Sequence, residues 1–358
     1  MLSSSSASKI RTIAASVSPL AAHGLPNTHP SRMALPAHIC DKARILSSRV
    51  TIFAARVKGD ELNYSAPRAP AETTAAYDLY RPDRPVAPVV ISVPHAGRDY
   101  DGALLGAARV EPAVLRRLED RWADLLAHPL IGQGHAVIVA RAPRALIDLN
   151  RHEREIDPAM VTGIPRDMPL QTSAKLRGGL GLIPRRLPGA YELWRRPVDW
   201  AEVQRRIDTI HRPYHAALGS LMRAAREEYG HAILIDLHSM PPLPPPAAGQ
   251  SPPAVVLGDR FGRAASARLM TLAQDVLAGH GITAAQNHPY AGDHMIERHG
   301  RPARDLYALQ VEVDRSLYLD AALDEPGPGL PALQQALTAM ITALASEQPR
   351  AAYPLAAE

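Results

Sequence analysis

The chain has 358 residues, of which 46% are hydrophobic, a formal net charge of +4 and a single cysteine. This length and apolar content allow a substantial buried core, and one cysteine excludes an internal disulfide framework and a cysteine-rich zinc site. Beyond residue 60 the basic residues are spread out and matched by carboxylates, so we expect no nucleic-acid partner. No stretch reaches the roughly 18 apolar residues that a membrane helix needs, so we expect a soluble, cytoplasmic protein without a membrane partner.

The N-terminal region differs in composition from the rest of the chain. Residues 1–59 are rich in Ser, Ala and Arg and contain one acidic residue, Asp41. This composition weakly resembles an organellar transit peptide, but a continuous apolar segment of the secretory kind is absent. We expect a disordered extension, or a start codon assigned too early with Met33 as the true start. The expected organisation is an extension at 1–69, a folded domain at 70–348 and a tail at 349–358.

The first predicted elements form a strand, a helix and two further strands. A β-branched apolar run predicts a buried strand at Val89–Val93. Apolar residues at i, i+3 and i+4 spacing, with a proline in the first turn, predict a helix over Glu111–His128. Two short apolar runs, 136–140 and 145–149, predict the next strands.

The second half of the chain continues this alternation. Residues 152–196 lack a sustained hydrophobic period and predict a long loop layer, of the kind that is often functional. A long amphipathic helix is predicted over 199–229, with a kink at Pro213. The remaining predicted elements are strands at 232–237, 254–257 and 308–313, helices near 264–280 and at 331–346, and a loop at 287–301. The alternation predicts an α/β fold with a mainly parallel or mixed sheet.

Polar side chains follow or interrupt four of the apolar runs. His95 follows the first strand, and Asn150 with Arg151 follows the run at 145–149. Asp236 and His238 end the run AILID, and Glu312 lies inside LQVEV. Because buried carboxylates and imidazoles are costly unless they are paired or bind metal, their convergence at one edge of a sheet predicts a site.

His95 and His238 are the expected metal ligands, because neutral imidazole suits zinc and a catalytic zinc site usually has three protein ligands. Either histidine alone is better explained as a hydrogen-bonded structural residue, and it is the pair that favours a metal. The third ligand is open between Glu119 and Asp120 in LEDRWADLL. We therefore expect one divalent metal ion, zinc first.

Two further residues have expected roles in chemistry. Glu312 is the candidate general base and acid, and its alternative is a structural pair with Arg315. Arg151 is the candidate clamp for a substrate carboxylate, because a guanidinium group offers a bidentate fork. Its alternative is a salt bridge to Asp148, Glu153 or Glu155. Ser239 lacks the glycine-flanked elbow of a serine hydrolase, which disfavours that class.

Many separate motifs resemble the N-formylglutamate amidohydrolase family over roughly residues 80–325. They are, in order, SVPHAG, LEDRWADLL, LIDLNR, HRPYHAAL, IDLHSM, VLGDRFG, PYAGDHMIERHGRP and LQVEVDRSLY. The resemblance implies a fold similar to zinc carboxypeptidases and the aspartoacylase group, with a mixed, mainly parallel sheet flanked by helices. It implies a metal bound by His95, Asp120 and His238, a catalytic Glu312, and substrate-binding residues Asn150, Arg151, Gly292 and Arg298.

The sequence departs from the family pattern in two places. Asp293 stands where many deformylating members are expected to have a second glycine, and Arg98 stands three residues after His95, where carboxypeptidases have a glutamate ligand. The resemblance implies hydrolysis of N-formyl-L-glutamate to formate and glutamate, in histidine breakdown. The alternatives are a hydrolase of another N-acyl amino acid or a small peptide, and a catalytically silent small-molecule binder. We expect a small substrate with a carboxylate, and the oligomeric state stays open.

Overall fold

The computed structural model describes residues 69–187, 192–245 and 251–348. The chain divides into two compact units, Met1–Asn63 and Tyr64–Glu358, and the described residues all belong to the second. Our expectations for residues 1–69 and 349–358 fall outside the described residues, apart from residue 69. No helix in the described part of the chain is both long enough and apolar enough to cross a membrane.

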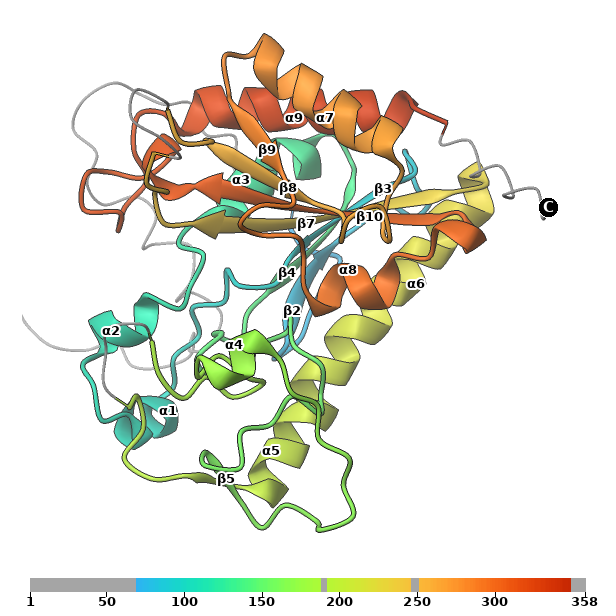
Figure 1. Ribbon diagram of the computed structural model, residues 1–358. Helices are drawn as coiled ribbons and strands as arrows, with labels where there is room; N and C mark the ends of the chain where they lie inside the picture. Colours follow the sequence, from blue (N-terminus) through green and yellow to red (C-terminus); the bar gives the residue numbers. More distant parts are fainter. Residues whose placement is uncertain (1–68, 188–191, 246–250, 349–358) are drawn as a thin grey trace, which may run out of the picture. The chain divides into compact units, whose positions relative to one another are not determined.

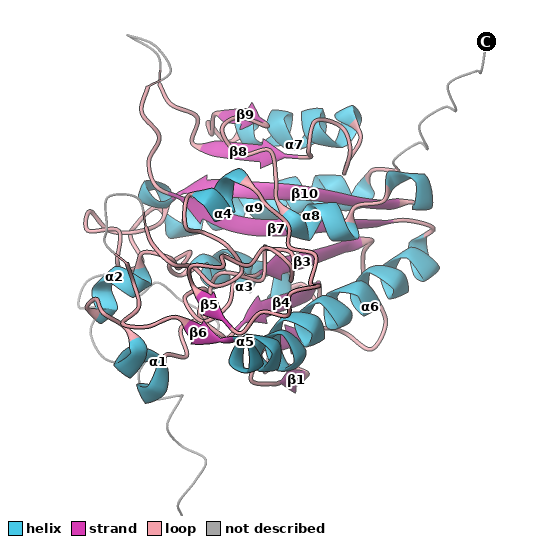
Figure 2. Cartoon of the chain, turned by 60° about the horizontal axis from the view of Figure 1, so that its bottom comes forward, coloured by secondary structure: helices cyan, strands magenta, loops and turns pink. Residues whose placement is uncertain are grey.

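An eight-stranded mixed sheet forms the centre of this unit (Figures 1 and 2). Its strand order is β1-β2-β4-β3-β7-β10-β8-β9. The four central strands are parallel to one another, while β2 and β8 run antiparallel to their central neighbours. The strands are β1 (Glu72–Thr73), β2 (Tyr77–Tyr80), β3 (Val89–Val93), β4 (Ala136–Ala140), β7 (Ala232–Met240), β8 (Val255–Gly258), β9 (Ala284–Gln286) and β10 (Leu306–Asp314).

Helices cover both faces of the sheet, as Figure 1 shows. On one face, α3, α7 and α9 contribute Leu126, Leu269 and Leu337 to one apolar cluster. On the other face, α6 contributes Leu218 and Met222 to a second cluster. The bounds are α1 (Gly102–Ala107), α2 (Pro112–Arg116), α3 (Ala123–Gly132), α4 (Ala174–Arg177), α5 (Trp200–Arg206), η2 (Ile207–His211), α6 (Arg212–Tyr229), α7 (Ala267–Gly279), α8 (His294–His299), η3 (Pro302–Arg304), η4 (Arg315–Leu317) and α9 (Leu330–Ser346).

The central strands are apolar throughout because both of their faces are buried. Val90 and Leu234 pack toward α6, whereas their neighbours Ile91 and Ile235 pack toward α3, α7 and α9. The predicted fold class, a mixed and mainly parallel sheet flanked by helices, is therefore confirmed. The predicted strands at 89–93 and 136–140 match the structure to the residue.

The helix predicted over 111–128 is broken into α2 and α3 by residues 117–122. Trp122 has a left-handed backbone with φ of 56°, and its indole N–H donates to Asp324 O at 2.8 Å. The apolar period is real on both sides of the break, since Leu115 and Leu126 are buried. The break between α2 and α3 thus coincides with a tertiary contact of Trp122. The apolar periodicity of the sequence cannot predict such a break.

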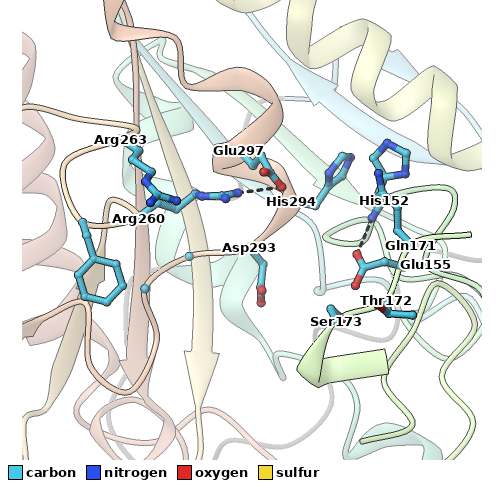
Figure 3. A pocket seen from close by; sticks show the side chains of 13 residues that line it. His152, Glu155, Gln171, Thr172, Ser173, Arg260, Arg263, Asp293, His294 and Glu297 are labelled. Carbon is cyan, nitrogen blue, oxygen red and sulfur yellow. Dashed lines mark hydrogen bonds and ion pairs between the residues drawn. The ribbon is translucent and has the colours of Figure 1, made fainter. Parts of the chain in front are cut away.

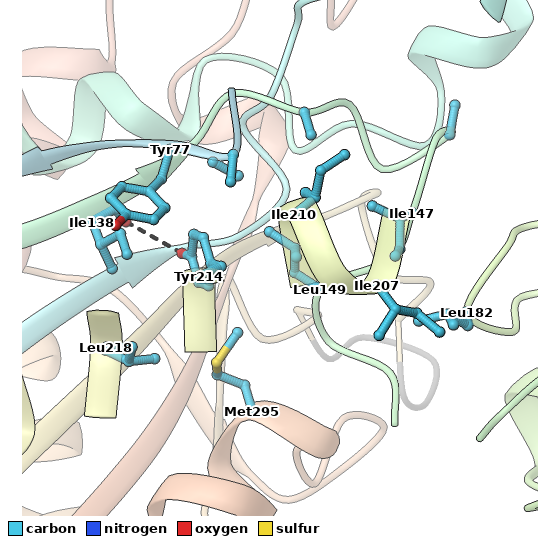
Figure 4. Close-up of a cluster of buried hydrophobic side chains, with 14 of the residues drawn as sticks. Tyr77, Ile138, Ile147, Leu149, Leu182, Ile207, Ile210, Tyr214, Leu218 and Met295 are labelled. Carbon is cyan, nitrogen blue, oxygen red and sulfur yellow. Dashed lines mark hydrogen bonds between the residues drawn. The ribbon is translucent and has the colours of Figure 1, made fainter. Parts of the chain in front are cut away.

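The strand predicted at 145–149 is wrong. The backbone N–H groups of Leu146 and Ile147 both donate to Pro143 O, which makes a turn. The apolar side chains of Ile147 and Leu149 are nevertheless buried against η2 (Figure 4). Burial without sheet hydrogen bonds therefore explains the misleading pattern.

The loop layer and the long helix are largely as predicted. Residues 152–187 and 192–196 are mostly irregular, with the short α4 and strand β5 (Val161–Thr162), which pairs with β6 (Val198–Asp199). The helix predicted at 199–229 runs through α5, η2 and α6, and its irregularity is a π-helical turn at Ile207–His211. This turn lies just before Pro213, which lacks the N–H that an α-helix needs. The loop predicted at 287–301 contains the short helix α8.

Candidate metal centre and active site

Three side chains from separate segments converge at the carboxyl ends of the central strands. His95 follows β3, His238 lies near the end of β7, and Asp120 lies in the break between α2 and α3. One nitrogen of each imidazole and one oxygen of Asp120 all lie within 4.8 Å of one another. Each of the three residues is 2% exposed. We call these three residues the aspartate centre.

Asp120 lies between the two imidazoles. Its Oδ2 is 2.9 Å from His238 Nδ1 and 3.5 Å from His95 Nδ1. The two ring centroids are 4.7 Å apart, with an angle of 60° between the planes. Both Nδ1 atoms thus lie near one carboxylate oxygen, as the ligand atoms of a tetrahedral metal site do.

Each imidazole has a second carboxylate on its other nitrogen. His95 Nε2 is 2.8 Å from Asp148 Oδ1, and His238 Nε2 is 2.9 Å from Asp236 Oδ2. A carboxylate accepts hydrogen bonds, so it keeps a proton on Nε2 and leaves Nδ1 as the ligand atom. Metal-binding histidines usually have such outer partners. The donor set and its support therefore fit a divalent ion such as zinc.

The centre carries buried negative charge that calls for a cation. Burial alone would raise the pKa of Asp120, but hydrogen bonds from His238 and His95 hold that pKa well below its usual range. Burial alone would lower the pKa of His238, but the carboxylate of Asp236 and the contact with Asp120 raise that pKa well above its usual range. Positive charge lowers the cost of burying these carboxylates. This favours a proton on the imidazole, and it would favour a bound metal ion in the same way.

The structure brings Asp120, and not Glu119, to the imidazoles. Glu119 turns away and pairs through Oε2 with Arg121 NH1 at 3.0 Å. Asp120 is held by its backbone N–H, which donates to His95 O at 3.0 Å, and by its Oδ1, which accepts from Arg315 NH2 at 3.2 Å. The break before α3 therefore fixes which of the two acidic side chains reaches the centre.

Glu312 lies beside the aspartate centre on the neighbouring strand. Its Cα pairs in register with His238, across β10 and β7. The side chain is partly exposed, and its Oε1 accepts a hydrogen bond from Gln310 Nε2 at 2.8 Å. Burial raises the pKa of Glu312, although the charge of His238 opposes this effect. A carboxyl group with a raised pKa at this place suits proton transfer near neutral pH.

Asn150 connects the centre to the first turn of α8. Its Nδ2 is 3.1 Å from His238 Nε2, and its Oδ1 accepts from the backbone N–H of Met295 at 2.7 Å. Its backbone N–H donates to Asp148 Oδ1 at 2.9 Å. Asn150 therefore contacts both an imidazole of the centre and the carboxylate that orients the other imidazole.

Arg151 is 2% exposed, and most of its polar atoms have internal partners. Nε donates to Leu180 O at 2.9 Å, and NH1 donates to Asn150 O at 2.7 Å. NH1 also lies 3.1 Å from Asp293 Oδ2. Of the partners expected for a salt bridge to Arg151, Asp148 lies 4.0 Å away, whereas the nearer carboxylate is that of Asp293, which is not among them.

A cavity of about 370 Å³ adjoins this region (Figure 3). Gly292 and Asp293 line it, and the backbone N–H of Asp293 donates to Gln310 Oε1 at 3.2 Å. A side chain at Gly292 would lie 2.1 Å from Ile296 Cδ1, and φ there is 103°, so glycine is required. Arg298 lies in α8. Burial is the main reason why the pKa of His294 is lowered, and the positive charge of Arg298 adds to this effect. The cavity's described lining includes no member of the aspartate centre.

Two residues that support the centre, Asp148 and Arg315, were not predicted to contact it. Asp148 orients His95, and Arg144 Nε donates to Asp148 Oδ2 at 2.8 Å. The signal for Asp148 is a carboxylate inside the apolar run ALIDL, which calls for a buried partner. From the sequence alone, Asp148 is expected only as a partner of Arg151. Arg315, considered as a partner of Glu312, instead contacts Asp120 and Ser239.

The protein thus has an α/β fold with a mixed β-sheet. Near the carboxyl ends of its parallel strands, two imidazoles and one carboxylate form a candidate centre for a single metal ion. A family model described as N-formylglutamate amidohydrolase matches residues 87–319. The chain belongs to this family.

Individual relatives agree with this assignment. A Pseudomonas putida protein named N-formylglutamate deformylase is 29% identical over 243 residues, which cover 65% of this chain and 82% of the relative. A Pseudomonas aeruginosa protein of the same name is 26% identical over 238 residues, with the same coverage of both chains. The crystal structure of N-formylglutamate amidohydrolase from Ralstonia eutropha JMP134 is similar with a TM-score of 0.69 and 35% identity, covering 75% of this chain and 97% of that one.

Proposed function

We propose that this protein hydrolyses N-formyl-L-glutamate to formate and L-glutamate, with one divalent metal ion bound by His95, Asp120 and His238. The observation that carries the proposal is the aspartate centre, in which one nitrogen of each imidazole and one carboxylate oxygen lie within 4.8 Å of one another, in a member of this family. Zinc is the first candidate, because two imidazoles and one carboxylate form a common catalytic zinc set. The family resemblance further implies a role in histidine breakdown, in the cytoplasm.

The metal ion, when bound, would supply a Lewis acid for the formyl carbonyl and lower the pKa of a bound water. The remaining chemistry belongs to side chains of the protein. Asp148 and Asp236 hold the two imidazoles by their Nε2 atoms, which would leave both Nδ1 atoms free to bind the ion. Arg315 holds the other oxygen of Asp120 and so keeps this carboxylate in place.

Glu312 is the group that moves the proton. It lies beside His238 on the adjacent strand, and Gln310 holds one of its oxygens. Its raised pKa brings proton uptake closer to neutral pH, so Glu312 can take a proton from water and then give it to the leaving amine of glutamate.

Arg151 would bind a carboxylate of the substrate. Its NH1 lies 3.1 Å from a carboxylate oxygen of Asp293, which supports this position as one that accepts a carboxylate. The side chain of Asp293 is 35% exposed, whereas that of Arg151 is 2% exposed, so Asp293 is the more easily displaced partner. A substrate carboxylate would replace Asp293, and Asn150 would position the neighbouring part of the substrate.

A substrate panel with metal-loaded protein tests this proposal. N-formyl-L-glutamate should be the best substrate, ahead of N-acetyl-L-glutamate, N-formylglycine and formyl dipeptides, and chelation should stop turnover. A higher kcat/KM for another N-acyl amino acid or a peptide would move the assignment to that substrate. A metal-loaded protein that binds N-formylglutamate without hydrolysing it would instead be a silent binder.

A further inference from the structure

Three buried histidines lie together outside the aspartate centre. His211 ends the π-helical turn η2, His215 lies one turn later in α6, and His294 begins α8. They are 0%, 1% and 7% exposed, respectively. One ring nitrogen of each lies within 4.8 Å of the corresponding nitrogens of the other two. We call these three residues the histidine cluster.

Backbone carbonyls fix the protonation of two of these rings. His211 Nε2 is 2.8 Å from Arg151 O, and His215 Nε2 is 2.9 Å from Leu149 O. A carbonyl only accepts, so each Nε2 carries the proton and each Nδ1 presents a lone pair. Backbone carbonyls are among the usual outer partners of metal-binding histidines.

Several ligand atoms of the cluster are buried without a hydrogen bond. Within the described part of the chain, His211 Nδ1 and both ring nitrogens of His294 have no hydrogen-bond partner. Buried polar atoms are rarely left in this state, because the loss of hydration is then uncompensated. A bound ion is one of the established reasons for such atoms.

We infer that His211, His215 and His294 form a second metal site, which takes zinc or another divalent ion that prefers nitrogen ligands. Three neutral imidazoles make a known catalytic zinc set, which keeps a fourth position open. In the present arrangement the nitrogens span up to 4.8 Å, whereas tetrahedral zinc with nitrogens at about 2.05 Å needs roughly 3.4 Å between them. The rings would therefore move together by on the order of 1 Å on binding.

One contact opposes metal binding and identifies a control. His215 Nδ1 is 3.0 Å from His299 Nε2, so His299 donates to the lone pair that the metal would take. Binding at His215 requires His299 to give up this hydrogen bond. His299 is buried and stacks on His215 with ring centroids 5.3 Å apart, yet it is outside the group whose nitrogens converge.

The electrostatic surroundings keep the cluster neutral. Burial lowers the pKa of His211 to about 4 and that of His294 to about 2, so both are unprotonated at neutral pH. The charge of Arg298 acts in the same direction and also opposes a cation, while Glu153 and Asp148 favour positive charge at His211. Neutral imidazole is the form that binds metal.

One member of the histidine cluster borders the cavity. His294 lines the cavity of about 370 Å³, and His152 lies beside it with ring centroids 5.1 Å apart (Figure 3). A water molecule or a carboxylate of a ligand in this cavity would complete the coordination. The inference does not rest on the proposed function, because it concerns residues outside the aspartate centre.

Zinc stoichiometry of the full-length protein tests this inference. The protein is stripped of metal, titrated with zinc against a chromogenic chelator, and analysed for bound metal after gel filtration. Wild type should bind two zinc ions, His95→Ala should lose one and keep the other, and His294→Gln should lose the second. Loss of a direct ligand should weaken this second site by more than the roughly 10- to 100-fold that loss of an outer partner costs.

The matched control is His299→Gln, a substitution of a neighbouring buried histidine that should keep both zinc ions. Cobalt titration of wild type gives an independent readout, because two tetrahedral sites should add visible absorption up to two equivalents. A wild-type protein that binds a single ion, lost in His95→Ala, would overturn the inference whether or not the variants fold. It would also fall if His294→Gln kept two ions, or if His299→Gln lost one.

Discussion

The aspartate centre and the histidine cluster use the same side chain in opposite electrostatic settings. In the aspartate centre, carboxylates surround the imidazoles, and the pKa of His238 is raised. In the histidine cluster, the outer partners of His211 and His215 are neutral carbonyls, and burial lowers the pKa values of these rings. The first setting attracts a cation by charge, whereas the second offers only lone pairs.

The two regions therefore differ in how each would bind an ion. Buried carboxylates give tight binding and a defined charge, which suits a resident catalytic ion. Neutral imidazoles bind more weakly and depend more on the ion's preference for nitrogen. The two regions are joined by one short segment, since Leu149 and Arg151 supply carbonyls to the cluster while Asn150, between them, contacts His238.

The largest effect is expected from substitutions that remove a ligand of the aspartate centre and leave the histidine cluster unchanged. His238→Ala should abolish measurable hydrolysis, because a three-ligand site that loses one imidazole binds its metal far more weakly. His95→Ala should do the same. The measurement is turnover together with bound zinc. Variants that keep turnover and the metal of the aspartate centre would show that these imidazoles are not ligands.

Replacing Glu312 should slow hydrolysis and leave metal binding at the aspartate centre and the histidine cluster unchanged. Glu312→Gln removes the proton carrier but keeps the shape, so kcat should fall by about 10²- to 10⁴-fold while zinc content stays normal. Steady-state kinetics and metal analysis on the same preparation give the answer. A fall of less than tenfold would assign proton transfer to another group.

Substitution of Arg151 tests whether the segment that joins the aspartate centre to the histidine cluster also binds substrate. Arg151→Lys should lower kcat/KM for N-formylglutamate by roughly tenfold to a hundredfold, because a hydrogen bond to a buried charge contributes about 1.5 to 3 kcal/mol. Zinc content should stay normal, and an uncharged formamide should lose much less. If both substrates lose equally and the melting temperature drops, Arg151 only braces the loop through Asp293.

The smallest expected effect is a difference in how pH changes stability. The lowered pKa values of His211 and His294 mean that, below about pH 6.5, the unfolded chain takes up protons that the folded chain does not. Each such histidine should reduce the free energy of unfolding by up to about 1.4 kcal/mol per pH unit as the pH falls. His238 acts with the opposite sign, because its raised pKa adds stability that is lost as the pH rises through that pKa.

Urea unfolding of chelator-treated protein between pH 7 and pH 5.5 measures this effect, in a range above the usual pKa of aspartate. His294→Gln should flatten the dependence relative to wild type. An unchanged slope would mean that His294 is not held neutral by its surroundings.

The strand-end residues could be predicted from the sequence, and the reasons are physical. The apolar runs before His95 and His238 and around Glu312 are β-branched, so the three strands themselves are predictable. Their ends are less so, because β7 continues to Met240, three residues beyond its predicted end. The choice of Asp120 over Glu119 depends on the break at Trp122, which is a tertiary effect. The contact of Asp148 with His95 depends on a turn, where the apolar pattern predicts a strand.

The histidine cluster is harder to predict for a different reason. His211 and His215 share one helix face at i, i+4 spacing, a pattern that is legible but not specific. Their partner His294 comes from a segment predicted as a loop, and 84 residues separate His215 from the adjacent His299. Local periodicity cannot join segments that meet only through the tertiary fold.

The sequence separations within the aspartate centre also set the order in which the protein can be completed during synthesis. His238 lies 118 residues after Asp120, and Arg315, which holds Asp120 from the far side, lies 195 residues after it. A nascent chain in which β7 has not yet left the ribosome lacks the proposed ligand His238 and a central strand of the sheet. Contacts this distant in sequence form slowly, because a long loop must close first. Metal uptake at this centre should therefore follow folding, and the ion should stabilise the finished domain by mass action.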